Sequence, residues 1–112
     1  MSSNDDHANN LAAALREAAA SGDLARLMGP LRALVATHKD LINARDDKGQ
    51  TALMKAAQSG SLDCVNALAM AGADLWADDK DGKGALKHAL VSCHADCATY
   101  LMDMLQHSTP PE

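Results

Sequence analysis

The stretch Asp46-Asp-Lys-Gly-Gln-Thr-Ala-Leu-Met-Lys-Ala56 returns 33 residues later as Asp79-Lys-Asp-Gly-Lys-Gly-Ala-Leu-Lys-His-Ala89. Across the 27 residue pairs that start from Asp46 and Asp79, 9 pairs are identical. The matches cluster at Gly, Ala and Leu positions, where turns and close helix packing restrict the choice of side chain. An internal repeat with this period predicts stacked units, because one unit alone is too small to bury its apolar face.

The second of these units reads as a turn, a helix, a second turn and a second helix. Its Asp-Asp-Lys-Gly turn at residues 46–49 supplies a glycine for a left-handed backbone, and Thr51 is placed to cap the following helix. Apolar residues then recur with helical spacing until Gly60, which is suited to end the first helix. A second helix is predicted over residues 62–71.

This unit resembles the ankyrin repeat. Its segments Gly49-Gln-Thr-Ala-Leu-Met-Lys-Ala-Ala57, Ser59-Gly-Ser-Leu62 and Gly72-Ala-Asp-Leu-Trp-Ala77 match the family pattern of helix start, inter-helix break and closing Gly-Ala-Asp, with the correct spacing. The resemblance covers residues 15–105. It implies an all-α ankyrin-repeat solenoid of about three helix-turn-helix repeats, with about six helices and short β-hairpin fingers.

One domain is expected over residues 11–107, between flexible tails at 1–10 and 108–112. Its repeats are placed at about 11–45, 46–78 and 79–107. The first unit exceeds the period by five residues near Pro30, which predicts a lengthened or interrupted second helix over about 23–38. The third unit replaces the family's inter-helix Gly by Cys93. Because atypical end units shield the core of a solenoid, we expect a complete three-repeat protein.

The composition narrows the class of protein. Hydrophobic residues make up 47% of the chain but aromatic residues only 2%, which argues against a β-sandwich or β-barrel. The net charge of −5, without a basic stripe, disfavours nucleic acid as a partner. No apolar stretch reaches the roughly 20 residues of a membrane span, and the N-terminus does not read as a secretory signal. We therefore expect a protein of the cytoplasm that does not bind membranes, with the nucleus left open.

The cysteines and histidines suggest chemistry only weakly. Cys93-His94-x-x-Cys97, with His88 nearby, lacks the second ligand pair that a zinc site needs. Cys97 aligns with Cys64 at a position where the family carries Val or Ile, so both are predicted to be buried apolar residues. No catalytic residue, metal site or cofactor is predicted, and the chain is expected not to be an enzyme. A redox role for Cys93 stays open.

The resemblance also implies where a partner protein would bind. In this family, hairpin tips and first helices line a concave face that grips another protein. Carried over by position, the expected partner-binding residues are Asp46, Asp47, Lys48, Gln50, Met54, Lys55, Gln58, Trp76, Asp79, Lys80, Asp81, Lys83, Lys87 and His88. We expect a non-catalytic protein–protein interaction module, acting as a small regulator or adaptor in the manner of small ankyrin proteins.

Alternatives remain for the function and for one residue. The chain is expected to be a monomer, but a structural subunit of a homo-oligomer or permanent complex is the second hypothesis. A thiol- or metal-dependent sensor is the third. Trp76 stands where the family carries Asn, so it either forms a binding hot spot or covers the end of the third unit near Leu90 and Cys93.

Overall fold

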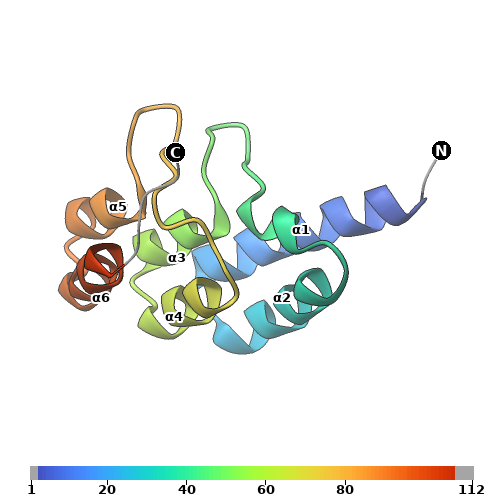
Figure 1. Ribbon diagram of the computed structural model, residues 1–112, viewed down its shortest axis with the longest axis horizontal. Coiled ribbons are helices and arrows are strands. Elements are labelled where there is room, and N and C mark those ends of the chain that lie inside the picture. The colour runs from blue at the N-terminus through green and yellow to red at the C-terminus, as the bar shows by residue number, and fades with distance from the viewer. Residues whose placement is uncertain (1–2, 108–112) are drawn as a thin grey trace.

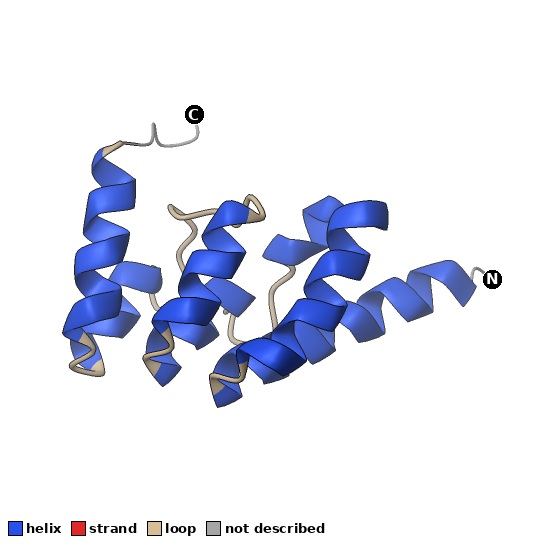
Figure 2. Cartoon of the chain, turned by 90° about the horizontal axis from the view of Figure 1, so that it is seen from below, coloured by secondary structure: helices blue, strands red, loops and turns tan. Residues whose placement is uncertain are grey.

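The structure, a computed structural model, describes residues 3–107, with side chains described from Asn9 onward. Its helices form three antiparallel pairs that stack side by side (Figures 1 and 2). The pairs are α1 (Ser3–Ser21) with α2 (Leu24–Thr37), α3 (Ala52–Ser59) with α4 (Leu62–Met70), and α5 (Ala85–Val91) with α6 (Ala95–Gln106). A short 3₁₀ helix, η1 (Lys39–Asn43), follows α2. The predicted all-α repeat solenoid is confirmed.

The six helices lie in two layers. The inner helices α1, α3 and α5 pack on one another, and α2, α4 and α6 form the outer layer (Figure 1). Two loops project from the inner layer on the same side of the molecule: finger 1, residues 44–51, and finger 2, residues 77–84. The inner layer and the fingers therefore share one continuous surface.

Alanine occupies several fully buried positions of the inner helices. Ala19 in α1, Ala56 and Ala57 in α3 and Ala89 in α5 are all fully buried. Larger side chains fill the space between the layers, with Leu27, Leu34, Leu68 and Leu101 fully buried. Small residues at helix contacts let thin pairs stack closely, so the low aromatic content follows from the architecture.

The helix ends of the second unit are capped as its sequence predicts. The hydroxyl of Thr51 accepts the N–H of Met54, and the hydroxyl of Ser61 accepts the N–H of Cys64. Gly60 has φ 79°, the left-handed conformation expected after α3. In the third unit, Gly84 and His94 stand at the N-caps and neither makes a side-chain capping bond. Helices α5 and α6 therefore lack the usual contribution of an N-cap side chain, about 1 kcal/mol each.

The first unit departs from expectation at its N-terminus. Residues 3–10 belong to α1, whereas a flexible tail was expected over 1–10; the tail at 108–112 lies outside the described residues. Of the two alternatives predicted for the second helix, the structure has the lengthened one, because α2 spans Leu24–Thr37 and runs unbroken through Pro30. The preceding residue is Gly29, which has no Cβ to collide with the proline ring, and this removes part of the usual obstacle to a helical residue before proline.

The linking segments also differ in detail. No sequence pattern predicted η1, the short 3₁₀ helix that follows α2. Within residues 3–107, finger 2 contains one isolated β-bridge, between Asp78 and Gly84, and no strand is formed in either finger. The short β-hairpin fingers expected are thus turns closed by a few backbone bonds. No helix in the described part of the chain is long and apolar enough to cross a bilayer.

Cys93 adopts a backbone conformation that favours glycine. It has φ 62°, the one positive value outside glycine among the described residues, and its side chain is exposed. A left-handed conformation costs a residue with a Cβ about 1–2 kcal/mol. Glycine avoids this cost but loses more conformational entropy on folding, so the net gain from glycine is smaller. We therefore expect Cys93→Gly to raise the free energy of unfolding by about 0.5–1 kcal/mol in urea titrations. Cys93→Ser keeps the strain and serves as the control; equal stability of the two variants would contradict the assignment.

Candidate partner-binding surface

One aspartate organises finger 1. Oδ1 of Asp46 accepts the backbone N–H groups of Lys48 and Gln50, both at 2.9 Å. Its Oδ2 lies 3.1 Å from the ammonium nitrogen of Lys55, on inner helix α3. The backbone turn is closed by the Gly49 N–H, which donates to the Asp46 carbonyl at 2.9 Å. A single side chain therefore fixes the shape of the finger and ties it to the helix behind it.

Finger 2 repeats this arrangement in the same register. Oδ1 of Asp79 accepts the backbone N–H groups of Asp81 and Lys83, both at 2.9 Å. Nε2 of His88, on α5, lies 2.9 Å from Oδ2 of Asp79. Because an ionised carboxylate only accepts, Nε2 carries the proton and donates it in this bond. The repeat thus keeps the aspartate and exchanges a lysine for a histidine on the inner helix.

The fingers stabilise the ionised form of both aspartates. The backbone N–H of Lys83 lowers the pKa of Asp79 most, burial opposes it, and the bond from His88 lowers it further, so that the pKa lies below its ordinary value of 3.8. Burial raises the pKa of Asp46, but the bonds from Gln50 and Lys55 outweigh it and the net shift is again downward. Both carboxylates are therefore charged at neutral pH and act as structural acceptors.

A pH dependence follows from the Asp79 pairing. Because its pKa is lower in the folded than in the unfolded chain, the charged form stabilises the fold above the ordinary pKa, and this contribution disappears as pH falls through the folded value. Asp79→Asn should therefore lower the free energy of unfolding at pH 7 and lower it progressively less as pH falls below about 4. Urea titrations at a series of pH values measure this. Asp47→Asn, at an exposed position of finger 1, is the control; equal effects of both variants at all pH values would refute the assignment.

The two fingers are joined to each other. The N–H of Lys80 in finger 2 donates to the carbonyl of Lys48 in finger 1 at 3.1 Å, and Nη1 of Arg45 donates to the carbonyl of Asp78. A Cβ at Gly49 would lie 3.0 Å from the Lys80 nitrogen, so the backbones approach as closely as glycine permits. Finger 1 and finger 2 therefore form one preformed surface.

The inner helices extend this surface toward the first unit. A hollow of about 280 Å³ lies between α1 and the base of finger 1, lined in part by Arg16, Glu17, Asp46 and Lys55. Arg16 and Glu17 were not among the residues expected from the sequence. Aligning residues 15–19 with 53–57 places them opposite Met54 and Lys55, and this alignment is the signal that could have found them. The hollow is strongly charged and contains both signs.

Three of the expected partner-binding residues are buried, which corrects the sequence interpretation. Met54 is 1% exposed because its side chain packs into the core. Asp79 and His88 are 7% and 8% exposed because each is the other's partner inside finger 2. None of these three side chains is available to touch another protein in this conformation.

The other expected residues lie at the surface. Half-buried or exposed side chains at the fingers and on the inner helices are Asp46, Asp47, Lys48, Gln50, Lys55, Gln58, Lys80, Asp81, Lys83 and Lys87. Trp76 is separate from this group. It is 38% exposed and lines a hollow with Leu90 and Leu105 at the end of the third unit.

The cysteines lie in two different environments. Cys64 and Cys97 are fully buried at equivalent positions of α4 and α6, and burial raises the pKa of both thiols. Cys93 is exposed at the turn between α5 and α6. Among the described residues, no three His, Cys, Asp or Glu side chains converge as a metal site would require. The two buried thiols act as small apolar side chains, as the repeat register predicts.

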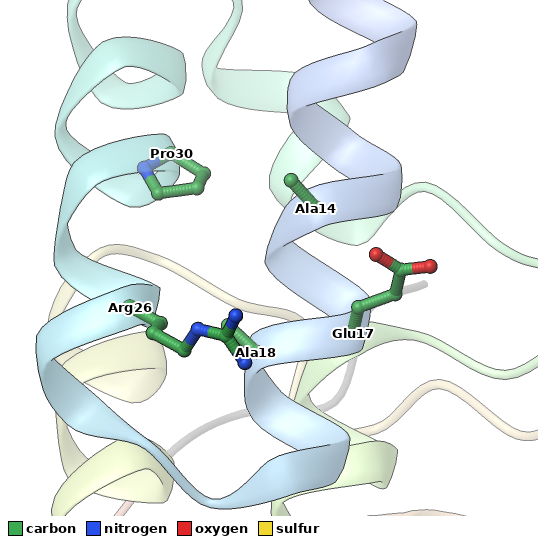
Figure 3. A pocket seen from close by; sticks show the side chains of 5 residues that line it. All are labelled: Ala14, Glu17, Ala18, Arg26 and Pro30. Carbon is green, nitrogen blue, oxygen red and sulfur yellow. The ribbon is translucent and has the colours of Figure 1, made fainter.

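A further hollow lies on the first unit. It has a volume of about 220 Å³ and is lined by residues of α1 and α2. Figure 3 shows Arg26 extending from α2 toward Ala18 on α1, while the carboxylate of Glu17 points away from α2. Pro30 forms its wall on α2. The charged rim distinguishes this hollow from the apolar one at the third unit.

Comparison with known proteins adds independent findings. A family model for ankyrin repeats, in three copies, matches residues 15–109. The Notch-regulated ankyrin repeat-containing proteins of Xenopus tropicalis and Xenopus laevis are each 34% identical over 68 residues. That match covers 61% of this chain and 60% of theirs, so the chain spans about 60% of the length of these curated relatives.

Two solved structures share the architecture. One is the Bd0816 predatory endopeptidase from Bdellovibrio bacteriovorus in complex with immunity protein Bd3460, with 38% identity and a TM-score of 0.70 over 80% of this chain and 45% of that chain. The other is the yeast ribosomal protein Rps3 in complex with its chaperone Yar1, with 27% identity and a TM-score of 0.76 over 88% of this chain and 69% of that chain. Both structures are complexes between two proteins.

Proposed function

This chain belongs to the ankyrin repeat family, and we propose that it is a non-catalytic regulator or adaptor that binds another protein through fingers 1 and 2 and the inner helices. Ankyrin repeats are protein–protein interaction modules, and the two structural neighbours are complexes with partner proteins. The partner of this chain is therefore expected to be a protein.

The joined fingers are the observation that carries the proposal. Asp46 and Asp79 hold the two turns in the same shape, and the bond from Lys80 to Lys48 locks them together. A surface that is already ordered loses little conformational entropy on binding, so a small patch gives useful affinity. The exposed Asp and Lys side chains at the tips make specificity depend on matching charges in the partner.

Affinity capture with paired variants tests the proposal. The full chain and the double variant Asp47→Ala/Lys80→Ala are used as baits against lysate of the organism that encodes the chain. The matched control is Asp63→Ala/Arg32→Ala, which removes one acid and one base from exposed positions of the outer helices. We expect the finger variant to capture at least tenfold less partner than the wild type, while the control variant captures the same amount as the wild type. Equal capture by both variants would refute binding through the fingers.

The proposal also includes one domain over residues 11–107 and a cytoplasmic setting. The three free thiols, two of them buried, support a reducing compartment. Fractionation of cells that express the tagged chain, followed by immunoblotting, tests the location. Recovery in a membrane or secreted fraction would contradict it.

A further inference from the structure

The third unit ends in an open apolar surface, here called the end face and made of Leu75, Trp76, Leu86, Lys87, Leu90 and Leu105. These side chains line a hollow of about 410 Å³. Leu90 is 56% exposed, although Ala57, at the same repeat position of the second unit, is fully buried within the stack. Trp76, the single tryptophan of the chain, is 38% exposed beside it. Large apolar side chains gathered at one exposed place mark an interaction surface.

The turn residues between paired helices bear on whether a further repeat could stack on the end face. Gly22, Gly60 and Cys93 hold the same left-handed position in the three units. Ser61 and His94 are equivalent residues of the second and third units. A Cβ at Gly22 would lie 3.4 Å from Cβ of Ser61, and a Cβ at Gly60 would lie 2.5 Å from the His94 ring. The Gly22 distance is an ordinary contact, whereas the Gly60 distance leaves no room for a Cβ, so the third unit packs on the second because residue 60 is glycine. Cys93 carries a Cβ at the equivalent position, so a unit with a ring in the place of His94 would not stack in this way on the end face.

The first unit offers no matching surface in its described hollow. That hollow is lined by Glu17 and Arg26, and burying them against Leu90 would remove two charged groups from water (Figure 3). A head-to-tail contact between copies is therefore unfavourable. A contact between two end faces places apolar side chains against apolar side chains.

The charges and the position of the end face fit a second copy of the same chain. Lys87 and Asp78 line the same hollow, and a two-fold contact brings the lysine of one copy toward the aspartate of the other. The molecule measures 42 × 32 × 25 Å, and its third unit forms one end of the long axis (Figure 1). The end face is therefore free of the two other units on this side.

We infer that two copies associate through their end faces, with Leu90, Leu105 and Trp76 at the centre and Lys87 paired with Asp78 of the other copy at the rim. The dimer uses Asp78 of finger 2 and Lys87 of α5, but the exposed tip residues Asp47, Lys48, Lys80 and Asp81 do not line the hollow. The dimer would therefore leave these finger tips open in both copies.

Sedimentation velocity on the full chain, from about 1 µM to about 1 mM, tests the dimer. We expect a monomer–dimer equilibrium with a micromolar Kd, weakened at least tenfold by Leu90→Glu. Met70→Glu is the matched control, because Met70 is 77% exposed on α4, away from the end face. Leu90 is more than half exposed, so its variant should fold, and far-UV circular dichroism checks this. A wild-type monomer over the whole range, or equal weakening by both variants, would overturn the inference.

Trp76 and the charged pair give two further readouts. The tryptophan emission should shift to longer wavelength on dilution of the wild type and stay at the longer wavelength in Leu90→Glu. Lys87→Asp should weaken the dimer, and adding Asp78→Lys should restore at least half of the lost affinity, because each charge meets the opposite one in the other copy. Unchanged emission on dilution, or no restoration in the double variant, would refute the end-to-end arrangement.

Discussion

Replacing Gly60 by alanine should lower the free energy of unfolding by about 2–4 kcal/mol. Two effects add at this position. Its φ of 79° disfavours any residue with a Cβ by about 1–2 kcal/mol. The new Cβ would also lie 2.5 Å from Nδ1 of His94, which forces the third unit away from the second. Because whole domains are stable by only about 5–15 kcal/mol, the loss should be visible in urea titrations and in the melting temperature.

Gly82→Ala separates the two effects. Gly82 has φ 78°, but a Cβ there meets no atom within 4 Å, so only the backbone cost of about 1 kcal/mol is expected. His94→Ala in the Gly60→Ala background should recover the steric part, giving a coupling of at least about 1 kcal/mol in a double-mutant cycle. Equal costs for Gly60→Ala and Gly82→Ala would show that His94 does not hold the third unit in place.

Replacing Leu68 by alanine should have an effect of similar size, about 2–5 kcal/mol. Leu68 is fully buried on α4, in the middle unit, where both neighbouring units pack against its helix pair. Truncation leaves a cavity that a chain with only 2% aromatic residues has few large side chains to refill. Chemical denaturation followed by circular dichroism measures the loss.

Leu62→Ala is the matched control for this truncation. Leu62 begins the same helix but is 39% exposed, so less than about 1 kcal/mol should be lost. If Leu62→Ala destabilised the protein as much as Leu68→Ala, the assignment of Leu68 to the buried face of α4 and of Leu62 to its exposed face would be wrong. Both variants keep the helix propensity of α4 close to its original value, because Leu and Ala are both strong helix formers.

The helix pairs could be predicted from the sequence because their signals are local. Thr51 and Gly60 stand where the cap and the turn need them, and α4 begins at the predicted residue 62. The length of α2 was predicted, but the sequence left open whether the helix is interrupted, because a proline signals a break and Gly29 relieves it only partly. Helix η1 has too short a sequence to show any periodicity.

The partner-binding surface was predicted less well, because exposure depends on neighbours that a repeat pattern does not describe. The positions of Asp47, Lys48 and Lys80 followed from the turns alone. Met54 was assigned to the surface from its place in the family pattern, yet this apolar side chain turned inward. Lys55 in the second unit and His88 in the third are different residue types, so the sequence did not show that each pairs with the aspartate of its own finger.

The missing N-cap bonds of α5 and α6 have a consequence for how the molecule opens. In a stack where each unit touches only its neighbours, local stability is graded along the chain. The third unit has one neighbour among the described residues, uncapped helices and a strained Cys93, so its amide protons should exchange with solvent sooner than those of α3. A ligand that covers this unit would slow that exchange, and proteolysis from the same side would be slowed with it.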